Sequence, residues 1–194
     1  MVQIKNILAL AGALLMLGCS SSPVERPPLS FTKFQPIHMA VSSIEIVDLY
    51  KSPLQSPYVE HLIPYSPSEA IHIWVKDRLR AVGSNRTMQV IIKDGSVTGK
   101  QEETPGMFGF EPVRSVRYTA KLDVEMRLYN DGQNLSVAAI EVTANRSISV
   151  NSLATVGMRD TAFRSLISDM MTEVNAELEK DLFAYMGNYI TYQN

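Results

Sequence analysis

The chain is poor in the residues on which several kinds of site depend. Among its 194 residues it has one cysteine and three histidines, so the composition disfavours a disulfide framework and a zinc site with several Cys or His ligands. Positive charge is not in excess either, since 18 Lys and Arg residues stand against 20 Asp and Glu residues. Because binding to a phosphate backbone needs a basic surface, the sequence predicts no nucleic-acid partner.

Sequence motifs of catalysis are also missing. The chain has no G-x-S-x-G motif, no phosphate-binding loop and no C-x-x-C pair. His38, His61 and His72 have no second ligand at a recurrent spacing, and Lys76 stands where a second histidine would follow His72 in a zinc-protease helix. We therefore expect no catalytic residue, no metal site and no cofactor.

The first nineteen residues have the order of a secretory leader. Lys5 precedes an apolar run at residues 7–17, which is followed by Gly18 and Cys19. Eleven residues form only about 16 Å of helix, which is shorter than the roughly 30 Å core of a bilayer. Met16-Leu17-Gly18-Cys19 resembles the lipobox of bacterial lipoproteins. The alternative is an ordinary leader whose cysteine lies near the cut by chance.

The resemblance to a lipobox implies that Cys19 carries lipid. A lipid bonded to the sulfur also explains why an exported chain would keep a single cysteine. Ser20 follows where lipoproteins of the inner membrane often carry Asp, so the resemblance implies an outer-membrane anchor facing the periplasm. We expect a leader at 1–18, a lipidated, Pro-rich flexible tether at 19–35 and one domain at 36–194.

Hydrophobic periodicity predicts the first half of this domain. Residues 37–47 alternate with one slip, as in a strand with a bulge at residues 42–43. Ser66, Pro67 and Glu69 form a capping box, and the apolar spacing that follows predicts a helix over 67–82. A second strand is expected around residues 88–92.

The second half contains the clearest strand of the chain. Apolar and polar residues alternate strictly over 116–128, and Asn130-Asp131-Gly132-Gln133 favours a tight turn into a further strand that reaches residue 150. Apolar spacings of three and four predict a helix over 159–189. The fold class is therefore α+β, in the order β-α-β-β-β-α, with a four-stranded, mostly antiparallel sheet and two helices on one face.

Two features are candidates for contact with a partner or lipid. The Gly- and Pro-rich connection at 99–112 carries Met107, Phe108 and Phe110; the alternative is that this loop folds back over the end of the sheet. Arg114, Arg117 and Lys121 form a basic cluster that suits phosphate groups. The alternative for the cluster is a solvated face of mixed charge, because Asp123 and Glu125 follow it.

The layout from about residue 37 to 190 resembles a group of bacterial periplasmic lipoproteins, the lipopolysaccharide-assembly lipoprotein LptE and the auxiliary lipoproteins of ABC-type lipid transport. The resemblance covers the helix at 67–82, the paired strands at 116–128 and 135–150, and the C-terminal helix. It implies a non-enzymatic adaptor in an envelope complex with a barrel or transporter. Two alternatives are a small periplasmic hydrolase with a site in the 52–65 loop and at the sheet edge, and a structural envelope lipoprotein that contacts peptidoglycan or itself.

Overall fold

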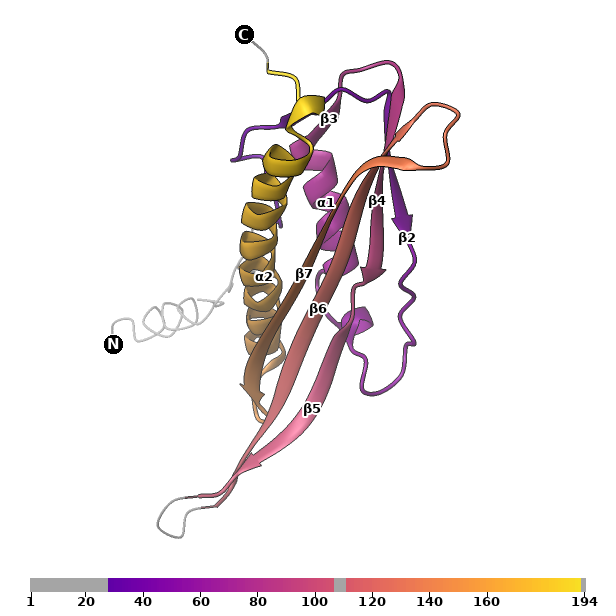
Figure 1. Ribbon diagram of the computed structural model, residues 1–194. Coiled ribbons are helices and arrows are strands. Elements are labelled where there is room, and N and C mark those ends of the chain that lie inside the picture. Colours follow the sequence, from indigo (N-terminus) through magenta and orange to yellow (C-terminus); the bar gives the residue numbers. More distant parts are fainter. Residues whose placement is uncertain (1–27, 107–110, 193–194) are drawn as a thin grey trace, which may run out of the picture.

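The computed structural model describes residues 28–106 and 111–192. Its largest part is a sheet with two helices on one side (Figure 1). The strands of this sheet are β2 (Ser43–Asp48), β4 (Arg86–Asp94), β5 (Val97–Thr104), β6 (Val113–Asn130) and β7 (Ser136–Asn151). Helices α1 (Pro67–Arg78) and α2 (Val156–Tyr185) lie against it, and short 3-10 turns occur at η1 (Glu60–Leu62) and η3 (Gly187–Tyr189).

The centre of the sheet is β6. It pairs antiparallel with β7 along nearly its whole length, and on its other edge with β4 and then β5. Strand β2 adds to β4 in parallel. The antiparallel pairing of β6 with β7 confirms the hairpin predicted for residues 116–150. The prediction of four strands is wrong: the main sheet has five, because β5 follows β4 along the same edge of β6.

A second correction concerns the expected loop at 99–112. Its first half is the strand β5, which pairs residue for residue with the start of β6. The run Gly-Lys-Gln-Glu-Glu-Thr has little intrinsic preference for a strand. The long partner strand supplies its hydrogen bonds, which local composition does not reveal.

The third correction concerns residues 37–47, which do not form one bulged strand. Strand β1 (Ile37–Met39) pairs in parallel with β3 (Leu79–Ala81) in a separate two-stranded sheet, while β2 joins the main sheet. The same pairing ends α1 at Arg78, before the expected residue 82. Gly83 is needed here, because a Cβ atom would collide with the backbone of Ala40.

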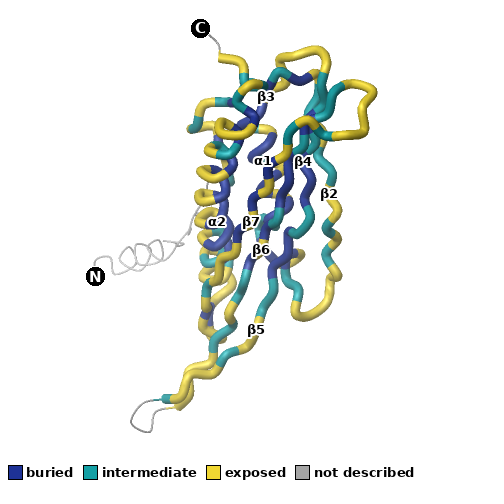
Figure 2. The backbone as a smooth tube through the Cα atoms, viewed as in Figure 1, coloured by how far each residue is buried: buried dark blue, intermediate teal, exposed yellow. Residues whose placement is uncertain are grey.

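The core lies between the sheet and the helices (Figure 2). Trp74 of α1 is fully buried, and its indole N–H donates to the side-chain oxygen of the buried Asn175 of α2 at 2.9 Å. The capping box at Ser66 and Glu69 forms as expected. Helix α2 begins at Val156, and the side chain of Thr155 accepts a hydrogen bond from the Met158 N–H at its start.

Residues 30–35 belong to the folded body. Phe31 is only 4% exposed, and its N–H donates to Asp77 Oδ2 at 2.7 Å. Arg78 donates both to the Gln35 carbonyl oxygen and to Glu179 of α2. We call residues 30–35 the strap. The sequence predicted a flexible tether up to residue 35 and a domain from residue 36. The strap shows that residues 30–35 already pack against the domain.

Candidate functional site

Four of the residues predicted to be functional lie outside the described part of the chain. They are Cys19, the expected point of lipid attachment, and Met107, Phe108 and Phe110 of the connection between β5 and β6. Their roles stay predictions. The strands on both sides of that connection are described, and they show where it begins and ends.

Strands β5, β6 and β7 extend beyond the rest of the body and form an arm (Figure 1). We define the arm as residues 97–104, 113–120 and 145–151. In β6, residues 113–119 are exposed or half-buried, whereas alternate residues from Ala120 to Leu128 are buried. Tyr118 packs edge-on against Phe163 of α2 with ring centres 4.7 Å apart, near the base of the arm.

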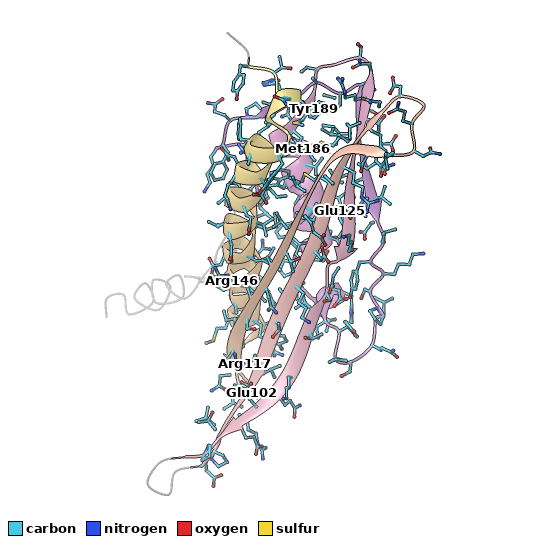
Figure 3. The ribbon with its side chains drawn as sticks, viewed as in Figure 1. Glu102, Arg117, Glu125, Arg146, Met186 and Tyr189 are labelled. Carbon is cyan, nitrogen blue, oxygen red and sulfur yellow. The ribbon has the colours of Figure 1, made fainter. Side chains whose placement is uncertain are left out.

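The basic cluster is divided by the geometry of β6. Because successive side chains of a strand point to opposite faces, Arg114 lies on the other face from Arg117 and Lys121. Arg114 Nε is 2.8 Å from Glu103 Oε1, and Arg117 Nε is 2.8 Å from Glu102 Oε1 (Figure 3). Both carboxylates come from β5, so the sequence-adjacent strand neutralises two of the three cations. Lys121 is exposed.

A second set of charges crosses the open face of the sheet. Lys93 Nζ lies 2.8 Å from Glu125 and 2.8 Å from Glu141, which joins β4, β6 and β7. Arg127 donates two hydrogen bonds to Glu125, which hold the pKa of that carboxyl below its ordinary value although the side chain is largely buried. Burial raises the pKa of the neighbouring Asp123. These ion pairs link β4, β6 and β7, and most of the charged groups in them have an oppositely charged partner.

The 52–65 loop, where the hydrolase alternative places its site, borders a small depression. Glu60, Ser68 and His72 line one depression of about 230 Å³ beside Gly95. The Glu60 carboxylate accepts hydrogen bonds from the Tyr50 hydroxyl and the Val97 N–H. Ser68 Oγ is buried and has no hydrogen-bond partner in the described structure, so it has no base to activate it. These contacts hold the 49–65 segment against β5.

A larger groove, of about 650 Å³, lies between residues 59–64 and the first turns of α2. Phe163 and Tyr118 are among its more buried lining residues, while Leu62 and Val156 are exposed at its sides. Arg159, Asp160 and Arg164 complete the lining with charge. The sequence reasoning missed this groove, because its walls come from segments about 100 residues apart.

A neighbouring depression of about 420 Å³ lies beside the groove. It is lined by Pro28, Leu29, Tyr65 and the side of α2 around Ile167, and it shares Arg164 with the groove. Arg164 also lies over the Tyr65 ring, with its guanidinium carbon 5.4 Å from the ring centre. The described chain therefore begins next to the groove.

Metal clusters and membrane-spanning helices are absent from the described residues. The described residues contain no group of three or more His, Cys, Asp or Glu side chains placed to hold a metal ion. Within the same residues, no helix combines the length and apolar character that a membrane span requires. The three histidines lie in β1, η1 and α1 and do not come together.

Comparison with known proteins gives structural likenesses and no sequence match. No family model matches the chain, and no curated protein matches it. A minor lipoprotein from Acinetobacter baumannii is 13% identical with a TM-score of 0.36, over 80% of this chain and 98% of that one. A putative neuraminyllactose-binding hemagglutinin homolog from Helicobacter pylori is 9% identical with a TM-score of 0.39, over 84% and 96% of the two chains.

A third solved structure, a DUF330 protein from Xanthomonas campestris, is 11% identical with a TM-score of 0.31, over 73% of this chain and 91% of that one. We assign no residue role from any of the three likenesses, because fold alone does not determine function.

Proposed function

We propose that the chain is a lipid-anchored envelope protein that acts as a non-enzymatic adaptor or accessory subunit in envelope assembly or lipid transport. It is attached through Cys19 to the outer membrane and faces the periplasm. The lipobox-like sequence before Cys19 supports the anchor. The observation that carries the adaptor role is the arm, which extends beyond the rest of the body and whose outer side chains are largely exposed (Figure 1). Only its base, at Val97 and Ala120, belongs to the core.

The arm is built for contact. Its strands hold one another through ladder hydrogen bonds and through ion pairs such as Arg117–Glu102. Exposed ion pairs of this kind contribute little stability, about 0–1 kcal/mol each. A paired projection whose outer side chains contribute little to the core supports a role in recognition. Its partner would be an envelope protein, a barrel or a transporter.

The strap supports the proposed attachment. It is fastened to α1 and α2 through Asp77 and Arg78, so the described chain begins at one fixed place on the body. An anchor at that place would hold the body at the membrane and leave the arm free to reach a partner.

Affinity capture of the tagged full chain from native membranes tests this proposal. We expect a stoichiometric envelope protein with the wild type and much less of it with a double variant, Phe108→Ser with Phe110→Ser. Leu135→Ser is the matched control, because Leu135 is 80% exposed at the β6–β7 turn, away from the 105–112 connection. The control should capture the partner as the wild type does.

Three results would contradict the adaptor role or its assignment to the connection. The first is a wild-type chain that captures no stoichiometric partner. The second is hydrolysis of general ester or peptide substrates by the purified chain, which would favour the hydrolase alternative. The third is a large fall in melting temperature for the double variant, which would make Phe108 and Phe110 part of the core.

A further inference from the structure

We propose that the groove between residues 59–64 and α2 binds an anionic phospholipid, with an acyl chain in the groove and the phosphate at Arg159 and Arg164. This inference goes beyond the adaptor role by naming a ligand. It rests on the proposed anchoring only for the source of the lipid, which is the bilayer to which Cys19 attaches.

The shape and lining of the groove suit an acyl chain. Its volume of about 650 Å³ falls within the range of about 300–1,000 Å³ for small-molecule sites. Phe163 and Ile63 are buried in its lining, and Leu62 and Val156 are 68% and 79% exposed at its sides. These side chains offer an acyl chain apolar contact both inside the groove and at its sides.

The charge at the groove selects an anionic ligand. Its lining contains two guanidinium groups, Arg159 and Arg164, and one carboxylate, Asp160. Arg164 Nε lies 3.1 Å from Asp160 Oδ2, so the three groups together carry one net positive charge. A guanidinium offers phosphate a planar pair of donors.

The chain outside the described structure ends beside the groove. Pro28 and Leu29 line the neighbouring depression, and Arg164 is common to both. Cys19 stands nine residues before Pro28, and nine residues span at most about 30 Å at 3.3–3.6 Å each. An anchored Cys19 would therefore keep the groove within about one bilayer thickness of the membrane surface, where phospholipid is abundant.

Site-specific photocrosslinking of the full chain in bacterial cells tests the inference. A photoreactive benzoylphenylalanine replaces Leu62 in one variant, Val156 in a second and Leu135 in a control. Leu62, Val156 and Leu135 are all exposed, but only the first two line the groove. We expect mass spectrometry to find phospholipid adducts at positions 62 and 156 and few at position 135.

A second substitution tests the charge. Adding Arg159→Ala to the Leu62 photocrosslinking variant should lower the phospholipid adduct about tenfold, which is the loss that one charge-assisted hydrogen bond supports. Arg159→Lys should keep more of the adduct. Arg159 is exposed on α2, so thermal unfolding should be unchanged in both variants.

The outcomes separate the groove from the anchor. Protein adducts in place of lipid, no adduct at positions 62 and 156, or equal lipid adducts at all three positions would each overturn the inference. Membrane fractionation of the same variants reports the anchor independently. If the chain is not anchored, the purified full chain mixed with phosphatidylglycerol in detergent micelles still tests the groove, and absence of the adduct there would refute it.

Discussion

Replacing Phe31 by alanine tests whether the strap is a structural part of the body. Phe31 is 4% exposed and packs with the main core. A large-to-small change at a buried phenylalanine costs about 3–5 kcal/mol, of which about 1.5–3 kcal/mol is the loss of apolar burial. We expect the lower end, about 3 kcal/mol, because Phe31 lies on a short segment that can relax around the cavity.

The strap sets an upper limit on this loss. If the strap detaches while the rest stays folded, the variant loses no more than the free energy with which the strap docks. That free energy includes the hydrogen bonds from Phe31 N–H and the Ser30 hydroxyl to Asp77, at 2.7 and 3.2 Å. A loss well below about 3 kcal/mol, together with faster proteolysis near residue 30, would indicate detachment before global unfolding.

Urea unfolding of the full chain followed by circular dichroism measures the effect. A loss of about 3 kcal/mol corresponds to a fall in melting temperature of about 6–12 °C for a protein of this size. Phe183→Ala is the matched control, because Phe183 of α2 is 42% exposed, and it should cost less than about 1 kcal/mol. Equal stability and equal protease resistance of Phe31→Ala and wild type would refute the reasoning.

Three further changes have definite expectations. Asn175→Leu leaves the Trp74 indole N–H without its acceptor. This variant should lose about 1–3 kcal/mol of stability in urea unfolding. If adding Trp74→Phe recovers none of the lost stability, the unpaired indole N–H is not the cause. Burial raises the pKa of Glu60, but hydrogen bonds from the Tyr50 hydroxyl and Val97 N–H outweigh it and hold the pKa below the ordinary 4.5. The stability that ionised Glu60 contributes is present above pH 4.5 and is lost as pH falls through the folded-state pKa. The stability of Glu60→Gln should therefore depend less on pH below 4.5. The same acid dependence as in the wild type would contradict the lowered pKa of Glu60. Arg146 (Figure 3) forms an exposed ion pair with Glu173, 2.8 Å apart. Arg146→Ala should therefore change stability by less than about 1 kcal/mol in urea unfolding, and a larger loss would contradict this expectation.

Local patterns predicted those elements whose signals are local. The strict alternation over 116–128 identified β6, and Asn-Asp-Gly identified the turn into β7. Ser66, Pro67 and Glu69 fixed the start of α1. In each case a few neighbouring residues determine the backbone, because a cap, a turn or a strand face needs no distant partner to be visible.

Elements that depend on distant pairing were not predictable in the same way. Strand β5 exists because β6 is long enough to pair with it, and β1 separates from β2 because β3 lies beside it. The partners of the basic cluster could not be predicted for a related reason. Glu102 and Glu103 neutralise Arg117 and Arg114 only in the register that the two strands adopt.

The most direct test of the proposed anchor is the intact mass of the protein purified from its native membranes. The account predicts the mass of residues 19–194 plus a diacylglyceryl group on Cys19 and an acyl chain on its amine, with the protein in the membrane fraction. A soluble protein with the mass of the unmodified full chain, its first eighteen residues still present, would contradict it.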